Sequence, residues 1–223
     1  MNKKRQRLFR WLFYLLGMLV LAVGLTLNTK TGFGASAVIS IPYTMSVLWG
    51  LDLGNTTFVM YILFVAVQLI LHRRAGRSVL LRDVLQIPVS LIFTRVINWV
   101  AAVFSVEEGV WLSTLPGRVA MLAAAVICTG IGAAMTLTMR LAPNPTDGLL
   151  QAVAECLKRK MGDMKNILDI TCVVLSLLLG TAFGRPLAGV GVGTVAAALG
   201  VGRVMALFNR LCREKLCLLS GVD

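Results

Sequence analysis

Charged side chains are scarce in this sequence of 223 residues. Asp, Glu, Lys and Arg make up 14% of it, whereas soluble domains contain about 25%. Hydrophobic residues make up 57%, and the mean hydropathy is +0.83. A soluble protein of this size has too little interior to hide so many apolar side chains, and no polar stretch is long enough for a large cytosolic catalytic domain. The composition therefore predicts an all-α protein that crosses a membrane several times.

Metal-ligating and catalytic patterns are also missing. The chain has one histidine, His72, and five cysteines that form no CxxC pair, whereas a structural zinc site needs about four ligands at close spacing. No HExxH or GxSxG motif and no usefully spaced pair of acids is present. We therefore expect no metal, no cofactor and no enzymatic activity. His72 lies in a His-Arg-Arg run at a membrane boundary, where we expect it to be solvated.

Acidic residues are few, and the basic residues occur in clusters. Ten acidic residues face 22 basic ones, which gives a net charge of +12. Clusters between apolar runs are typical of cytoplasmic loops, so this charge predicts contact with anionic lipid at the cytoplasmic face and no nucleic-acid partner. The pattern also places both termini in the cytoplasm. The four clusters are Lys3, Lys4, Arg5, Arg7 and Arg10; Arg73, Arg74, Arg77 and Arg82; Lys158, Arg159, Lys160 and Lys165; and Arg210, Arg213 and Lys215.

Hydrophobic runs predict six transmembrane helices, because a span needs about 20 apolar residues. Two further apolar stretches are too short or too broken to span. If they dip into the membrane and return, every basic cluster falls on one side and the acidic loop with Glu107 and Glu108 falls on the other. The alternative is eight full spans with one or two clusters misplaced. The predicted spans are residues 8–27, 55–71, 84–104, 118–139, 167–183 and 188–207, and the predicted re-entrant helices are residues 35–49 and 146–157.

An internal repeat appears when the sequence is shifted by about 110 residues. Each half, 1–108 and 109–223, has a span that ends in a cation, a Gly/Pro hinge, a hydroxyl residue, a short helix and two more spans. Three spans per half predict a 3+3 inverted repeat, an arrangement found in many secondary transporters. The matched residues are Lys30 with Arg140, Ser36 with Thr146, Asn55 with Asn166, and Arg95 with Arg203.

The hinges before the short helices are the predicted substrate site. A cation, a hydroxyl group and the amide end of a helix together suit a carboxylate, a phosphate or a similar anion. Arg95 lies near the middle of its predicted span, so we expect it to face the protein interior beside residues 32–36 or Asp169. The alternatives are an ion pair of Arg95 with Asp169, end-of-helix anchors at Lys30 and Arg140, and a helix-capping Asp147. The candidate substrate-binding residues are Lys30, Gly34, Ser36, Arg95, Arg140, Thr146, Asp147, Asp169 and Arg203.

Three stretches resemble the YczE/YyaS/YitT-type family of bacterial integral membrane proteins. They are Gly24–Ser36, the run Pro143-Asn-Pro-Thr-Asp-Gly148 and the run Gly189-Val-Gly-Val-Gly-Thr194. The resemblance covers nearly the whole chain and implies a multi-span protein of the bacterial cytoplasmic membrane. It implies no particular substrate. Where relatives often have Ser-Pro and an acid in the first hinge, this chain has Ala35-Ser36-Ala37, which argues against an ion site that needs a carboxylate there.

Two functions from different classes remain open. The leading hypothesis is a small secondary transporter or exporter of an anionic or zwitterionic small molecule. The alternative is a membrane scaffold or regulator that assists a partner protein and moves nothing. The sequence is compatible with a homodimer but does not set the oligomeric state.

Overall fold

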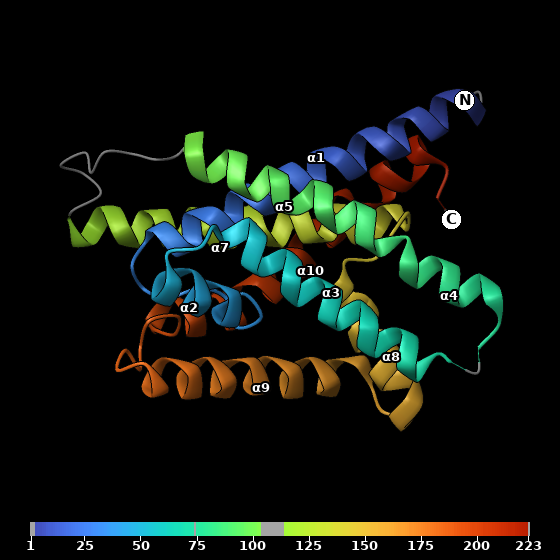
Figure 1. Cartoon of the computed structure of the whole chain (residues 1–223). Helices are drawn as coiled ribbons and strands as arrows, with labels where there is room; N and C mark the ends of the chain where they lie inside the picture. The colour runs from blue at the N-terminus through green and yellow to red at the C-terminus, as the bar shows by residue number, and fades with distance from the viewer. Residues whose placement is uncertain (1–2, 74, 104–113, 223) are drawn as a thin grey trace.

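A computed structural model describes residues 3–73, 75–103 and 114–222, and the regular structure in these residues is entirely helical (Figure 1). The N- and C-terminal ends lie at the same end of the molecule, where Gly221 approaches Gln6. The helices are α1 (Lys3–Lys30), α2 (Ser40–Trp49), α3 (Leu53–Leu71), α4 (Arg77–Val84), α5 (Gln86–Val103), α7 (Leu115–Met139), α8 (Pro145–Leu157), α9 (Met161–Ala182) and α10 (Val192–Ser220).

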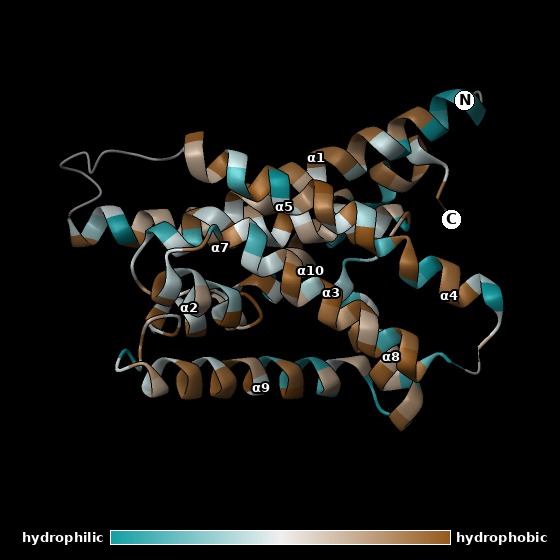
Figure 2. Ribbon diagram, viewed as in Figure 1, coloured by the Kyte–Doolittle hydropathy of each residue, from teal (hydrophilic) through white to brown (hydrophobic). Residues whose placement is uncertain are grey.

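Six helical segments of the described residues are long and apolar enough to cross a membrane, with α4 and α5 counted together as Arg77–Val103. The prediction of six spans is confirmed to this extent. Several helices run past the predicted limits: residues 8–27 are part of α1, and α10 continues to Ser220, although it begins at Val192 and not at residue 188. Hydropathy marks only the apolar stretch of a helix, whereas its charged ends continue into the interface. Figure 2 shows these hydrophilic ends at the N-terminus and in α4.

Helices α1 and α7 form the antiparallel centre of the bundle. Gly17 of α1 faces Met135 of α7, and Gly24 faces Thr129. A Cβ atom on Gly24 would collide with the backbone of Thr129, and one on Gly132 would collide with the backbone of Leu21. The two helices therefore approach closely because small residues leave room for the backbone.

The two short helices lie at opposite ends of the molecule. Helix α8 lies toward the end that holds the termini, and α2 lies toward the other end (Figure 1). At 1.5 Å per residue, the 10 residues of α2 and the 13 residues of α8 extend about 15 and 20 Å, which is less than the roughly 30 Å of a hydrocarbon core. Helix α2 begins at Ser40, later than the predicted residue 35, because Gly34 has a φ of +92° and a turn follows it.

Helix α9 joins the bundle through the two short helices. It packs against α2 and α8, while α10 packs against α7 and α1. Figure 1 shows α9 along one side of the molecule, with α2 and α8 between it and the other helices. Phe104, at the end of a predicted span, and the predicted outer loop with Glu107 and Glu108 lie outside the described residues.

Candidate functional site

The hinge between α7 and α8 is held by side chains of α1. Helix α7 ends where Arg140 adopts a left-handed conformation with a φ of 47°. The guanidinium group of Arg10 donates to the carbonyl oxygens of Met139 (2.7 Å) and Arg140 (2.9 Å). The Tyr14 hydroxyl donates to the carbonyl oxygen of Ala142 at 3.0 Å. Because α1 satisfies these carbonyl groups, the irregular backbone is supported at this position.

Helix α8 begins with a cap that also contacts α3. The Asn144 side-chain oxygen accepts a hydrogen bond from the Thr146 amide at 3.2 Å, and Pro145 occupies the first turn. The Asn144 amide group donates to the Tyr61 hydroxyl at 3.3 Å. Asp147 lies in the same first turn, and burial raises its pKa to about 6, although nearby Lys165 opposes this shift. The positive end of the α8 dipole therefore lies next to a half-buried carboxyl group.

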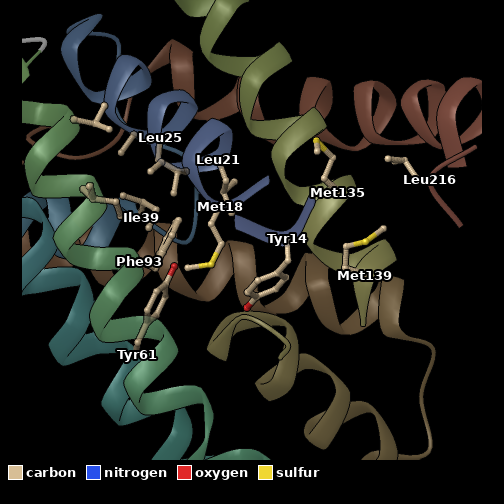
Figure 3. Packing of buried hydrophobic residues seen from close by; sticks show 14 residues of the cluster. Tyr14, Met18, Leu21, Leu25, Ile39, Tyr61, Phe93, Met135, Met139 and Leu216 are labelled. Carbon is tan, nitrogen blue, oxygen red and sulfur yellow. The ribbon is translucent and has the colours of Figure 1, made fainter. Parts of the chain in front are cut away.

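A cavity lies beside this start of α8. It offers about 30 Å³ to the centre of a water-sized sphere, which is room for one or two water molecules. The rings of Tyr61 and Phe93 stack with centroids 6.4 Å apart, and Figure 3 shows Met18 close to both tyrosines of the lining. The lining residues are Tyr14, Met18, Leu21, Tyr61, Val89, Ser90, Phe93, Thr136, Ala142, Asn144 and Pro145. This wall is aromatic and apolar, with hydroxyl and amide groups and no charged side chain.

A buried polar cluster fixes α8 against α3 and α5. Gln68 and Gln86 exchange amide hydrogen bonds of 2.9 and 3.3 Å, and Gln68 also donates to the carbonyl oxygen of Pro145 at 3.0 Å. His72 Nδ1 lies 2.7 Å from the Asp83 carboxylate, and Asp83 is buried. The expectation that His72 is solvated is wrong, because the ring turns toward this carboxylate and packs at the end of α3.

Only part of the predicted site lies near the cavity. Thr146 and Asp147 belong to the first turn of α8, which follows the lining residues Asn144 and Pro145. Arg140 is exposed at the end of α7 and does not line the cavity. Asp169 lies in α9, where its Oδ2 atom is 2.9 Å from Lys165 Nζ and its Oδ1 atom is buried with no hydrogen-bond partner among the described residues.

The first hinge lies at the other end of α1 and forms a separate packing site. Lys30 is exposed, and Ser36 is half-buried in the loop. Gly34 approaches the start of α10 so closely that a Cβ atom would press on Gly191 and Thr194. The neighbouring Ala35 amide donates to the carbonyl oxygen of Gly189 at 3.0 Å. The structure therefore does not bring this hinge together with the second one.

Arg95 and Arg203 lie on exposed helix faces. The Arg95 guanidinium donates to the Asn55 side-chain oxygen near the start of α3, and the Asn55 amide group donates to Asp52 at 2.9 Å. The expectation that Arg95 faces the interior beside residues 32–36 or Asp169 is wrong. Counting residues along α5 gives a depth, but the side of the helix depends on its neighbours, and here α3 supplies a polar partner.

Sequence comparison places the chain in a group without an assigned activity. A family model described as a family of unknown function, DUF6198, matches residues 8–210. The chain belongs to the DUF6198 family. It is 24% identical over 194 residues to an uncharacterised protein of Haemophilus influenzae, covering 87% of this chain and 80% of that protein. No solved structure matches.

Two relatives of this DUF6198 protein come from Bacillus subtilis. The uncharacterised protein YyaS is 22% identical over 202 residues, covering 89% of this chain and 92% of the relative. The uncharacterised membrane protein YczE is 23% identical over 203 residues, covering 91% and 86%. The resemblance to YczE and YyaS is confirmed, and with its six candidate spans the chain is a multi-pass membrane protein.

Several residues of this region were not predicted from the sequence. Tyr14, Tyr61 and Phe93 occupy spans in which aromatic side chains are ordinary core residues. Gln68 and Gln86 could have been predicted as a buried polar contact, because an uncharged amide within an apolar stretch needs a hydrogen-bond partner. Asn144, which lies between two prolines, could likewise have been predicted as the residue that caps the following helix.

Proposed function

We propose that this protein is a small secondary transporter built from two inverted halves, with its substrate site at the start of α8. The observation that carries the proposal is an exchange of short helices between the halves. Helix α8 packs against α3 of the first half, and α2 packs against α9 of the second. A two-fold axis between the halves would produce this reciprocal packing, with α1 and α7 paired at the centre.

The polar anchors of the two short helices support the same symmetry. Gln68 of α3 donates to the carbonyl oxygen of Pro145, the first residue of α8. Ser176 of α9 donates to the carbonyl oxygen of Ser40, the first residue of α2, at 3.2 Å and shares a 2.7 Å hydrogen bond with Thr44. Each short helix is therefore held at its start by the counterpart long helix of the other half. We assign both as re-entrant helices that enter from opposite faces.

The basic clusters give the orientation in this proposal. The N-terminus, α4, the junction of α8 with α9, and the end of α10 all lie toward the end of the molecule that holds the termini (Figure 1). Under the positive-inside rule this end is cytoplasmic. Both termini are then in the cytoplasm, α8 enters from the inside and α2 enters from the outside.

The chemistry at the start of α8 favours a zwitterion among the small charged solutes. The amide end of the helix can bind a carboxylate, and Asp147 can bind an ammonium group. The cavity has room for only one or two water molecules in this state, so a substrate would need the site to open; Tyr14, Tyr61 and Phe93 would then offer contact to an apolar side chain. No lining residue carries a positive charge, which disfavours a multiply charged anion. The proposed substrate class is therefore a zwitterionic small molecule with an apolar group, such as an amino acid.

The two halves differ in their packing, and this difference indicates how the substrate site would open to one side of the membrane and then to the other. Helix α3 packs against α5, and the Arg95–Asn55 hydrogen bond ties them. Over the described residues the counterpart helices α9 and α10 have no comparable packing, and Asn166 and Arg203 are both exposed. In the opposite state of the transporter, Asn166 and Arg203 would pair while Asn55 and Arg95 separate.

Paired cysteines test this alternation in membranes. In a variant without the native cysteines, the pairs Asn55→Cys with Arg95→Cys and Asn166→Cys with Arg203→Cys are treated with short bifunctional reagents. We expect both pairs to cross-link, each in part of the population. If the second pair never cross-links while the first always does, the alternating mechanism fails.

Uptake of radiolabelled amino acids into proteoliposomes tests the function itself. We expect uptake of at least one amino acid, reduced at least tenfold by Asp147→Asn. Glu155→Gln is the matched control, because it removes an exposed carboxylate at the far end of the same helix and should leave uptake unchanged. Binding without uptake, or neither for any amino acid, would favour the alternative of a non-transporting scaffold. The weakly packed helices α9 and α10 would then offer the surface for a partner protein.

A further inference from the structure

A polar groove lies between the C-terminal parts of α7 and α10. Its volume is about 160 Å³, far larger than that of the cavity beside α8. The ends of α7 and α10 that carry its lining residues lie at the end of the molecule that holds both termini (Figure 1). Its lining residues are Leu137, Thr138, Arg140, Asn209, Arg213, Cys217 and Val222.

The groove contains groups that suit a phosphate ester with a hydroxyl group. Arg140 and Arg213 provide two guanidinium groups, the side chain that best matches phosphate oxygens. The Asn209 Oδ1 atom is buried and has no hydrogen-bond partner among the described residues. An unsatisfied buried acceptor is unfavourable, so a hydroxyl donor would stabilise it if the Asn209 side chain turned toward the groove that it lines.

The negative end of the α7 dipole does not oppose an anion strongly here. Arg10 donates to the carbonyl oxygens of Met139 and Arg140, the last groups of that helix. Its positive charge therefore compensates the dipole and adds a third guanidinium group near the groove.

The surroundings of the groove are apolar and exposed. Leu137 at its edge is 40% exposed, and Leu211 and Leu218 on α10 are 66% and 76% exposed. A free phosphate ion would gain nothing from these side chains, whereas the acyl chains of a lipid would lie against them. Basic pockets between transmembrane helices on the cytoplasmic side commonly bind anionic lipid headgroups.

We propose that this groove binds the headgroup of an anionic phospholipid of the cytoplasmic leaflet, with phosphatidylglycerol as the best fit. Arg213 contacts the phosphate, Arg140 adds positive charge at the groove, and a glycerol hydroxyl donates to Asn209 Oδ1 once this side chain turns toward the groove. The site is independent of the proposed transport activity, because it shares no residue with the cavity beside α8.

Thermal unfolding of the full chain in mixed micelles tests the site. Phosphatidylglycerol should raise the Tm, and phosphatidylcholine should not. Arg213→Gln should remove at least half of that shift. Arg210→Gln is the matched control, because it removes the same charge from an exposed position one turn earlier on α10 that does not line the groove, and it should keep the full shift.

Further measurements distinguish the possible causes of the Tm shift. Asn209→Leu should lower the shift with phosphatidylglycerol but keep the shift with phosphatidic acid, which lacks the glycerol headgroup. Equal losses in Arg213→Gln and Arg210→Gln would indicate diffuse attraction of charges and overturn the proposal. A Tm shift of the same size with glycerol phosphate alone would identify a soluble-anion site and would also overturn it.

Discussion

At the scale of single residues, apolar helices place their charged side chains next to polar partners at the edge of the bundle. Arg95 lies on an exposed face of α5 and donates to Asn55, which is itself bonded to Asp52. Counting residues predicted neither its direction nor its neighbours, because α3 determines which side of α5 is polar and Asn55 lies in the first turn of α3. His72 shows the same limit: its neighbours in sequence are arginines, whereas its partner, Asp83, is eleven residues away.

The Arg95–Asn55 contact predicts that replacing Asn55 lowers the stability of the protein more than replacing Asn166 does. Asn55→Leu removes the partner of a guanidinium group in an apolar helix, and we expect a loss of about 1–3 kcal/mol in the free energy of unfolding. Asn166→Leu, at an exposed position of α9, should cost less than half as much. Thermal unfolding in detergent measures both. Equal losses would show that the Arg95 contact contributes nothing specific.

Asp147 predicts a pH dependence with a definite sign. Burial raises its pKa from 3.8 to about 6, so the unfolded chain releases this proton at a lower pH than the folded protein does. Its contribution to stability therefore falls as the pH rises from about 4 to about 6. We expect Asp147→Asn to be more stable than the natural protein at pH 8 and nearly equal at pH 4. A Tm difference that is the same at both pH values would contradict this assignment.

At the scale of helices, hydropathy and charge together predicted most of the elements. The six long segments and both short helices were expected, and α8 starts within one residue of its predicted position. The start of α2 was not predicted, because apolar Ala35, Ala37 and Val38 read as helix while the backbone turns after Gly34. Composition cannot distinguish an apolar turn from an apolar helix. The break between α4 and α5 at Leu85 was also not predicted, although Pro88 in the first turn of α5 favours a helix start there.

The close pairing of α1 and α7 predicts a strong effect from one added methyl group. In Gly24→Ala, the Cβ atom meets the backbone of Thr129, so the helices must move apart, and we expect a loss of about 1–3 kcal/mol in stability. Gly202→Ala is the control, because nothing lies within 4 Å of its Cβ position, and it should be neutral or stabilising by up to about 1 kcal/mol. Chemical denaturation of both variants provides the comparison. A tolerated Gly24→Ala would mean that the two helices are not held at this separation.

At the scale of the whole molecule, the sequence predicted an architecture but not a site. The cavity beside α8 takes its lining from α1, α3, α5, α7 and the hinge, so it depends on how five segments pack. The predicted cations at the hinges did not converge, because α1 and α7 run antiparallel and carry Lys30 and Arg140 to opposite ends. The repeat remains a prediction, and the two hinges that it matches lie at opposite ends of the helix pair α1 and α7.

The proposed orientation predicts a labelling pattern for the intact cell. In a variant without the native cysteines, Gly50→Cys lies in the exposed turn after α2 and should react with an impermeant maleimide added outside. Ser78→Cys in α4 should react only after the cells are opened. The reverse pattern would invert the orientation, and with it the placement of the lipid groove in the cytoplasmic leaflet.

The attachment of α9 sets an order for the synthesis of the chain. Thr44 and Ser176 are 132 residues apart, so the hydroxyl groups of α2 leave the ribosome long before their partner does. Until α9 arrives, α2 has no counterpart to hold its start, and the first half remains incomplete within the bilayer. We therefore expect a nascent chain that stops before Ser176 to pack α2 only against the first half and to fold incompletely.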